Sequence, residues 1–496
     1  MKINSASKAL IALMGLFSAS ANAQLPNTVA NPDTIVTNIT KGKLVISTLL
    51  NNDTDPDAGD TLYLINVGLP KFGKAEVKTV NGAKVVEYTP NNRFKGTDSF
   101  SYGISDRANG TGNSATSTVT ISNPFISGRG NYGASISGPG GPQDVTHDVS
   151  GYISMKVSPN GLFTCLFRFA GKSYRFKSSF EVGSNGAFVG VIDRTSIGLP
   201  DITLELNYAM TGSTRQITGA AIVAAERIAF TAPHSNWLKS SPPSAFGNYT
   251  VLLPAPNTLA TTPQGNGFAT MVISRTGGVA CIGRTGDGRG FSSSTFVGQT
   301  GTTAPVYGIV HSLGSIFGNF SFAGVAPRAA NVIATATGNL RWFAAKNARR
   351  IFFPKGFNLT VAARASAYTK PFVGTIINPS TQPAALKIAP TSPYNSNLTV
   401  SAGDFSAART ERASLGNLPT AGTYEGSFDN LRRFAAKLVV SPKNGTFSGA
   451  FYDVTKKKRR SFKGIFLQSE NKAFGVWKSP SRTGKVELTP DAITGT

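Results

Sequence analysis

Apolar and polar residues alternate in short runs along most of this chain, and turn-forming residues separate the runs. In one such run, Phe100, Tyr102 and Ile104 alternate with small residues. Successive side chains of a β-strand point to opposite faces, so this alternation is typical of strands with one buried face. Only residues 220–228 and 409–415 favour helices, and both stretches are short. The sequence therefore predicts an all-β protein.

The pattern repeats after residue 124. Three Gly-Asn-Tyr or Gly-Thr-Tyr motifs, at Gly130, Gly247 and Gly422, each begin a similar passage: an apolar run, a glycine turn and a second apolar run. Asn and Gly tolerate positive φ, so the Pro-Asn-Gly and Lys-Asn-Gly turns favour hairpins. The repeating length exceeds the roughly 20–50 residues of solenoid repeats. We expect three antiparallel β-sandwiches or small barrels.

The third repeat has the clearest strand pattern. Phe447, Gly449 and Phe451 share one face of a strand. A basic and aromatic return strand follows at residues 458–464, and a similar one occurs at residues 171–176 in the first repeat. Five successive strands are predicted, at residues 437–441, 446–453, 461–468, 473–477 and 485–489.

Residues 1–23 have the pattern of a secretory signal peptide. Lys2 and Lys8 supply positive charge, residues 9–17 are apolar, and Ala21-Asn22-Ala23 forms a cleavage site. The apolar run is shorter than the roughly 20 residues of a membrane-spanning helix, and no later segment approaches that length. We therefore expect an exported protein without a transmembrane span, which is secreted, at the cell surface or in the periplasm. The predicted parts are a signal peptide at 1–23, one domain at 24–123, and β-repeat units at 124–245, 246–375 and 376–496.

The net charge of +24 is unevenly distributed. Residues 24–123 carry nine basic and nine acidic side chains, whereas the chain from residue 124 onward carries 38 basic and 16 acidic ones. Exported basic surfaces bind acidic polysaccharide, lipopolysaccharide, anionic lipid or stray nucleic acid. The charges are dispersed and form no sequence-reading nucleic-acid module.

The densest basic run is a candidate binding site for anions. It falls between two predicted strands, hence at a hairpin tip. There it would either hold phosphate or sulfate groups or form a solvated turn. Its members are Lys456, Lys457, Lys458, Arg459 and Arg460.

An acidic turn at residues 52–60 reads N-D-T-D-P-D-A-G-D. Its carboxylates belong to Asp53, Asp55, Asp57 and Asp60. Negative groups this close repel each other unless water or a cation intervenes. Calcium takes six to eight oxygen ligands from carboxylates and carbonyls. The alternative is a solvated turn, because Asp, Asn, Pro and Gly are common turn residues.

Four motifs occur in order in and after this turn: Asn52-Asp53-Thr54-Asp55-Pro56-Asp57, Tyr88-Thr89-Pro90, Gly96-Thr97-Asp98-Ser99-Phe100-Ser101-Tyr102 and Ser105-Asp106. With these motifs, the region resembles the bacterial cadherin-like (Ig-like) domains of secreted and surface proteins. The resemblance implies an Ig/cadherin-like sandwich at 24–123 with an adhesion or spacer role linked to calcium. It adds Asp106 to the four acidic ligands. Asp98 is either a further ligand or the cap of its own turn. Such domains often occur in arrays, whereas this chain has one copy.

A second set of motifs spans residues 338–490. It comprises Gly338-Asn339-Leu340-Arg341-Trp342, Phe353-Pro354-Lys355-Gly356-Phe357, Tyr368-Thr369-Lys370-Pro371, Gly445-Thr446-Phe447-Ser448-Gly449-Ala450-Phe451, Phe462-Lys463-Gly464-Ile465-Phe466-Leu467-Gln468 and Thr483-Gly484-Lys485-Val486-Glu487-Leu488-Thr489-Pro490. This region resembles uncharacterised β-repeat regions of exported Verrucomicrobia and Planctomycetes proteins. This resemblance implies architecture and no activity.

The sequence offers little for catalysis. His147, His234 and His311 lie far apart, and none has a partner at metal-ligand spacing. Glycoside hydrolysis needs two placed carboxylates, and the acidic residues after residue 124 are mostly isolated. We expect a non-enzymatic protein. Trp237, Trp342 and Trp477 either form sugar-stacking platforms or pack in cores.

The chain has two cysteines, Cys165 and Cys281. They follow equivalent strand ends of the first two repeats, so a disulfide between them is one interpretation. The other is two independent buried thiols, because free cysteines are commonly buried.

Together these features predict an Ig/cadherin-like sandwich followed by repeated antiparallel β-sandwich or small-barrel units. The leading interpretation is an exported structural or adhesion protein of the cell envelope or extracellular space, with one Ca²⁺ in its first domain. Its partners would be cell-surface or matrix polymers. The alternative is a binding module for acidic glycans or lipopolysaccharide, acting through the basic repeats.

Overall fold

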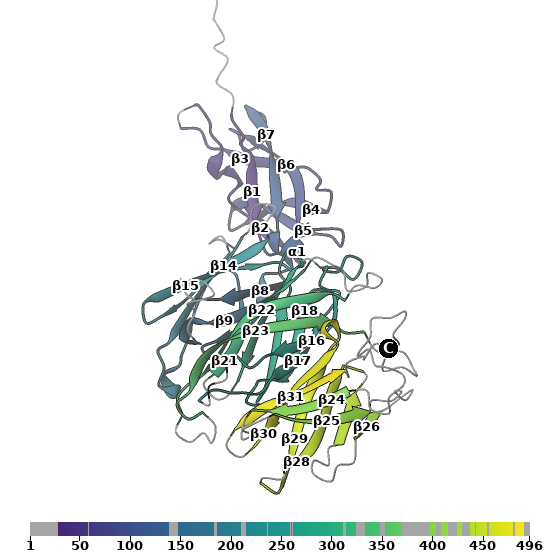
Figure 1. Ribbon diagram of the computed structural model, residues 1–496. Helices are drawn as coiled ribbons and strands as arrows, with labels where there is room; N and C mark the ends of the chain where they lie inside the picture. The colour runs from purple at the N-terminus through teal and green to yellow at the C-terminus, as the bar shows by residue number, and fades with distance from the viewer. Residues whose placement is uncertain are drawn as a thin grey trace, which may run out of the picture. The chain divides into compact units, whose positions relative to one another are not determined.

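The structure, a computed structural model, divides into an N-terminal unit, Met1–Asn123, and a C-terminal unit, Pro124–Thr496. The predicted signal peptide lies outside the described residues. In the described part of the chain, strands dominate, so the all-β prediction is confirmed (Figure 1). No helix there has the length and apolar character to cross a bilayer. The described residues are 28–57, 59–137, 147–182, 186–209, 215–235, 237–257, 259, 261–310, 314–323, 333–347, 353–369, 396–402, 408–414, 424–428, 437–441, 443–453, 456–479 and 482–490.

The N-terminal unit is a sandwich of two sheets. One sheet has the order β1-β7-β6-β3, with β1 parallel to β7, and the other has the order β2-β5-β4. Phe100, Tyr102 and Ile104 of β6 are buried, as their alternation predicts. The elements are β1 (Asp33–Val36), β2 (Leu44–Ile46), the 3₁₀ turn η1 (Leu49–Asn52), β3 (Tyr63–Val67), β4 (Gly73–Val80), β5 (Ala83–Pro90), β6 (Thr97–Ser105) and β7 (Ser114–Ser122).

The C-terminal unit begins with two four-stranded sheets, ordered β11-β10-β9-β8 and β12-β13-β14-β15, which we call the first β-unit. An isolated bridge between Tyr132 and His234 links β8 to the end of β15. Aromatic and aliphatic side chains of both sheets form one core. The elements are α1 (Pro124–Gly128), β8 (Gly130–Ile136), η2 (His147–Val149), β9 (Gly151–Val157), β10 (Leu162–Phe169), β11 (Lys172–Ser179), β12 (Ala187–Ile192), η3 (Thr195–Ile197), β13 (Ile202–Tyr208), β14 (Gln216–Val223) and β15 (Glu226–Pro233).

Neither predicted helix forms. Residues 220–228 contain the end of β14, a turn at Ala224 and Ala225, and the start of β15. Both turn alanines have positive φ, 46° and 71°, which suits a two-residue hairpin. The pairing of β14 with β15 therefore overrides the helix propensity of alanine. The described part of the other stretch is strand β25 (Arg409–Ser414).

The second β-unit is one eight-stranded sheet with the order β19-β18-β17-β16-β23-β22-β21-β20. Its first and last strands, β16 and β23, pair in the middle, so the sheet curls towards closure. Its core includes Met271, Cys281, Leu340 and Trp342. The strands are β16 (Gly247–Leu253), β17 (Gly267–Ile273), β18 (Gly278–Arg284), β19 (Gly290–Phe296), β20 (Thr303–Ile309), β21 (Gly314–Phe322), β22 (Thr335–Ala344) and β23 (Phe357–Ala367).

Side chains connect the two ends of this sheet, β19 and β20. Pro305 has no backbone N–H and weakens regular pairing in the middle of β20. The hydroxyl of Thr295 donates to the carbonyl of Pro305 at 2.6 Å, and the N–H of Tyr307 donates to the hydroxyl of Ser293 at 3.0 Å. Both hydroxyl-bearing residues are buried. These bonds satisfy backbone groups that a regular ladder would have paired.

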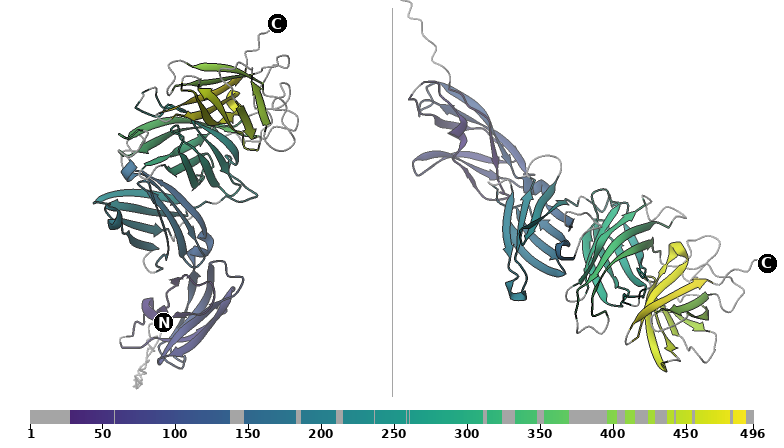
Figure 2. Two further views of the ribbon diagram at one scale, coloured as in Figure 1. Left: turned by 90° about the horizontal axis from the view of Figure 1, so that it is seen from below. Right: turned by 60° about the vertical axis from the view of Figure 1, so that its left-hand side comes forward.

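The third β-unit is a closed barrel in which β24 pairs with β31 (Figure 2). Phe447 and Phe451 are buried in its core. Tyr424 of the Gly-Thr-Tyr motif begins the third strand of this barrel, whereas the related motifs begin the first strands of the other two β-units. The strands are β24 (Ser396–Ser401), β25, β26 (Tyr424–Phe428), β27 (Lys437–Ser441), β28 (Thr446–Asp453), β29 (Lys458–Leu467), β30 (Lys472–Lys478) and β31 (Thr483–Pro490), with η4 (Gln468–Glu470) between β29 and β30.

Two different interfaces join the β-units of the C-terminal unit. Between the first and second, hydrogen bonds dominate: Tyr152 accepts from the N–H of Phe296 at 2.8 Å, and Tyr307 accepts from the N–H of Gly171 at 3.0 Å. Between the second and third, two apolar clusters are buried. The clusters comprise Leu252, Leu467 and Phe474, and Phe268, Ile465 and Val476.

We predict that Thr295→Val destabilises the second β-unit by about 1–3 kcal/mol, because it leaves the buried Pro305 carbonyl without its donor. Urea unfolding monitored by tryptophan fluorescence measures the change. Ser292→Ala, an exposed change on the same strand, is the control and should have little effect. Equal stabilities for Thr295→Val and wild type would contradict the role of this bond.

Candidate functional site

Three carboxylates of the acidic turn lie together. One oxygen from each of Asp55, Asp57 and Asp60 falls within 4.8 Å of the others. Asp55 and Asp57 are half-buried and Asp60 is exposed. The backbone N–H of Asp57 donates to Asp55 at 3.0 Å, which folds the turn back on itself. The turn therefore presents three anionic side chains to one point.

Asp53 faces another partner. Its carboxylate accepts hydrogen bonds from the Tyr102 hydroxyl at 2.9 Å and the backbone N–H of Asn31 at 2.7 Å. Asp53 and Tyr102 are both buried. Burial, followed by the bonds to Asp53 and Asp33, raises the pKa of Tyr102. Asp53 thus fixes the turn to β6 and the N-terminal segment.

Asp98 is also held by protein donors. It is 6% exposed and accepts bonds from the Tyr88 hydroxyl at 2.8 Å and the backbone N–H groups of Lys71 and Phe72 at 3.1 and 2.9 Å. It further accepts from the N–H of Ser99. The carboxylate joins the β3–β4 connection to β6. The structure does not bring Asp98 to the cluster.

Asp106 lies near the three clustered carboxylates. Loss of hydration, followed by the negative charges of Asp55, Asp60 and Asp106, raises the pKa of Asp57. A divalent cation would relieve that repulsion. Calcium accepts carboxylates in a flexible shell completed by carbonyls and water. The donor set of Asp55, Asp57 and Asp60, with Asp106 beside it, therefore fits calcium.

The basic run has one member that faces inward. Lys456, Lys457, Lys458 and Arg459 are exposed near the β28–β29 turn, as expected of a hairpin tip. Arg460, in contrast, is 6% exposed and forms an ion pair with Asp453 at 3.2 Å. Alternation along β29 turns this residue inward. Its assignment to an exposed anion site is therefore corrected.

The cysteines do not meet. Cys165 lies in the core of the first β-unit and Cys281 in that of the second, and both are free. Burial raises the pKa of both thiols, that of Cys281 to about 12. The disulfide interpretation is wrong for this structure, because each strand turns its cysteine into its own core.

Two histidines and two tryptophans have structural positions. His147 is buried, stacks on Phe343 with 4.5 Å between ring centroids, and bonds to Ser315 through Nδ1 at 2.8 Å. His234 is nearly buried, whereas His311 lies outside the described residues. Trp342 and Trp477 are buried, so core packing is confirmed for both. Trp237 is half-buried.

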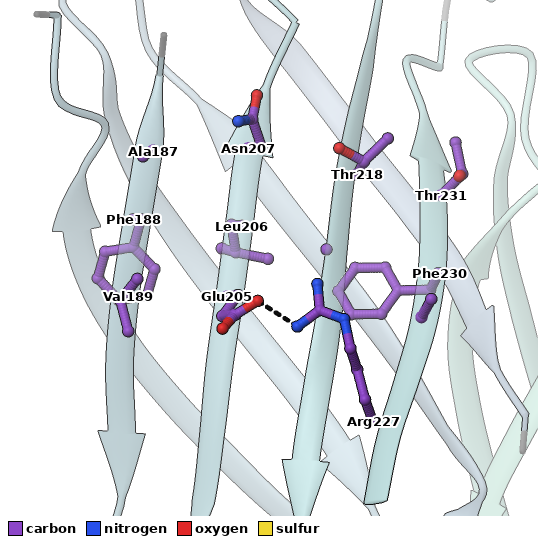
Figure 3. Close-up of a pocket in the computed structure, with 12 residues that line it drawn as sticks. Ala187, Phe188, Val189, Glu205, Leu206, Asn207, Thr218, Arg227, Phe230 and Thr231 are labelled. Carbon is purple, nitrogen blue, oxygen red and sulfur yellow. Dashed lines mark hydrogen bonds and ion pairs between the residues drawn. The ribbon is translucent and has the colours of Figure 1, made fainter. Parts of the chain in front are cut away.

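A hollow of about 830 Å³ lies along β12–β15 (Figure 3). Glu205 forms an ion pair with Arg227 there, and Val189 is 66% exposed at its edge. Glu205 is the one carboxylate among the described lining residues. The hollow thus lacks the carboxylate pair that glycoside hydrolysis needs.

A smaller groove of about 380 Å³ lies on the sheet β8–β11, beside Phe296 of the second β-unit. Lys156, Arg175 and Lys177 line it and are exposed. The sequence shows the basic return strand at residues 171–176, but it does not reveal this groove. Alternation along each strand predicts that Lys156, Arg175 and Lys177 point outward. Only the register between the strands shows that the three cations lie together on one face of the sheet.

Comparisons with known proteins bear on the N-terminal unit. Residues 24–122 match the family described as Bacterial Ig domain, which confirms the predicted Ig-like domain. This domain indicates a protein of the cell surface or extracellular space. No curated protein matches the chain.

Two solved structures show weak likeness over most of the chain. One is isotype 1 transferrin binding protein B from serogroup B Neisseria meningitidis, with 9% identity, a TM-score of 0.19, and coverage of 87% of this chain and 89% of that one. The other is intact Ap-TbpB with its N and C lobes, with 11% identity, a TM-score of 0.17, and coverage of 99% and 98%. Similarities this low carry no argument about this protein.

We predict that Arg460→Met lowers the free energy of unfolding of the third β-unit by about 3–5 kcal/mol, because Asp453 would remain as a buried charge without its cation. Urea unfolding followed by tryptophan fluorescence measures the loss. The matched control is Lys458→Met, an exposed change on the same strand, which should alter stability by no more than about 0.5 kcal/mol. Equal effects of the two variants would show that the ion pair contributes nothing.

Proposed function

We propose that this protein is an exported, non-enzymatic structural or adhesion protein of the cell envelope or extracellular space, and that its Ig-like domain binds one Ca²⁺. The observation that carries the proposal is the convergence of Asp55, Asp57 and Asp60 within 4.8 Å in a bacterial Ig domain. Asp106 supplies further negative charge beside them. When bound, calcium would neutralise the turn and tie it to the end of β6, where Asp106 follows Ser105.

A non-enzymatic role agrees with the chemistry of the two hollows described above. The larger holds one carboxylate in an ion pair, and the smaller is lined by cations and neutral groups. Mechanical or adhesive roles require a stable fold and an exposed surface. Calcium bound to the Ig-like domain would stabilise the fold of that domain. Cell-surface or matrix polymers are the proposed partners.

Calcium should stabilise the mature chain. At a calcium concentration 100 times the dissociation constant, the free energy of unfolding of the N-terminal unit should rise by about 2.7 kcal/mol. The reason is that the ion binds the turn in the folded state and not in the unfolded state. Calorimetry in calcium and in excess chelator measures this gain. The triple variant Asp55→Asn/Asp57→Asn/Asp60→Asn should lose it and should melt no lower than wild type in chelator, because the repulsion is gone.

Asp193→Asn is the matched control, since Asp193 is exposed and lies in the C-terminal unit. This variant should keep the full calcium response. Identical melting of the wild-type protein in calcium and in chelator would exclude the proposed site.

A second candidate function is the binding of acidic glycans or lipopolysaccharide through the basic β-units. The observation that favours it is the excess of basic residues after residue 124, together with the exposed cations at the β28–β29 tip and in the smaller groove. Unbalanced positive charge on an exported surface attracts anionic polymers.

We predict that the mature protein is retained on immobilised heparin or lipopolysaccharide at low ionic strength and is released as salt rises. Salt shortens the range of attraction, to about 10 Å at 0.1 M. Column elution in a salt gradient measures this, with neutral dextran as the control matrix. Equal passage through charged and neutral columns would exclude the second function.

A further inference from the structure

We call the smaller groove, on the sheet β8–β11, the basic groove. Its residues come from the outer face of β8–β11, and Phe296 of β19 forms one wall. Strand register places its side chains in rows that cross the sheet. One row runs through Asn131, Lys156, Thr164 and Lys177, and the next runs through Gly133, Ser154, Leu166 and Arg175.

The charge of this floor is one-sided. Lys156 and Lys177 flank Thr164 in one row, and Arg175 follows in the next row on the same strand as Lys177. All three cations are exposed, and none of the described residues lining the groove is acidic. Lys156 and Lys177 lie two strands apart, about 9.5 Å along the row. Like charges on one sheet face are unfavourable without an anion, so the arrangement favours an anionic ligand.

The interface between the first and second β-units fixes the shape of the groove. Beyond the two rows, Tyr152 accepts from the N–H of Phe296, and Arg168 donates to the carbonyl of Ser294 at 2.9 Å. Arg168 is therefore engaged in the interface, whereas the three groove cations remain exposed. A Cβ at Gly133 would come within 3.1 Å of the Phe296 ring and 2.3 Å of the Tyr152 hydroxyl. Glycine thus lets the aromatic wall approach the floor.

We propose that the basic groove binds a segment of an acidic polysaccharide that carries sulfate or carboxylate groups. Lys156, Arg175 and Lys177 would hold the anionic groups. Thr164 lies between Lys156 and Lys177, and Asn131 and Ser154 add polar side chains to the same two rows. These polar groups match sugar hydroxyls. This inference rests on the second candidate function and assigns it a site.

The apolar part of the groove favours a saccharide over a ligand recognised by charge alone. Leu166 lies between Ser154 and Arg175 in the second row and is half-buried, as is Phe296. An aliphatic side chain and an aromatic ring that line one groove suit the apolar C–H face of a sugar. The hydroxyls, cations and apolar wall together match the alternating chemistry of an acidic glycan.

The test uses the full mature chain and a heparin hexasaccharide as probe, with titration calorimetry at low salt. The groove variant is Lys156→Gln/Arg175→Gln/Lys177→Gln. Its matched control is Lys456→Gln/Lys457→Gln/Lys458→Gln, which removes the same charge from the exposed β28–β29 tip. Both must keep the wild-type thermal transition, as expected for exposed substitutions. We expect the groove variant to bind at least about tenfold more weakly and the tip variant less than about twofold more weakly.

Three results would overturn the assignment. Weaker binding in the tip variant alone would move the site and leave the second candidate function intact. Equal weakening in both variants would show that net charge alone is responsible. No binding by the wild-type protein would remove both the groove assignment and the second candidate function.

A further arm separates saccharide from phosphate recognition. Phe296→Ala should weaken binding of the hexasaccharide about twofold to tenfold and leave binding of an inorganic polyphosphate of similar charge unchanged. Tighter binding of the polyphosphate than of the hexasaccharide by wild type, with no effect of Phe296→Ala on either, would overturn the saccharide assignment.

Discussion

Pairing between the first and last strands is the constraint on which the second and third β-units depend. β16 pairs with β23, and β24 pairs with β31. A meander sheet that curls in this way buries one face of every strand and covers edges that would otherwise attract other chains. The two paired strands are far apart in the sequence, so bringing them together costs chain entropy. Burial of the apolar side chains in each core must offset this cost. In the second β-unit, Ser293 and Thr295 complete the closure where Pro305 interrupts it.

The first β-unit departs from this scheme in a useful way. Its two sheets are each four-stranded, and the join at β8 and β15 is a single bridge between Tyr132 and His234. The outer face of β8–β11 meets β19 of the second β-unit through Tyr152 and Arg168. Part of that face is covered and part is left open, and the open part carries the cations. The groove is thus a product of the interface between two β-units and of neither alone.

Much of the fold follows from local sequence patterns. Alternation correctly predicts that Phe447 and Phe451 face a core, and the spaced motifs correctly identify the Ig-like domain. The helix predicted at residues 220–228 does not form, because the helix propensity around Ala224 and Ala225 is weaker than the pairing of two apolar strands. Where a strand meets its neighbour depends on register, and a sequence does not display register.

The candidate sites show the same limit. From the sequence, the acidic residues form one group of candidate calcium ligands. In the structure, buried tyrosines bind two of these residues and separate them from the group. Tyr102 holds Asp53 and Tyr88 holds Asp98, while Asp55, Asp57 and Asp60 remain together. Arg460 likewise looks like part of a cationic run until its strand turns it towards Asp453. The basic groove was missed because its cations come from strands whose alignment had to be seen.

The thiols of Cys165 and Cys281 can report on the opening of two different β-units. Each sits in the core of a different β-unit, and burial suppresses the thiolate that reacts with disulfides and alkylating reagents. A reagent can therefore label either thiol only after the β-unit that contains that thiol opens. Peptide mapping of the modified residue would separate the opening rates of two adjoining β-units in an unaltered chain, including under applied force or at a surface.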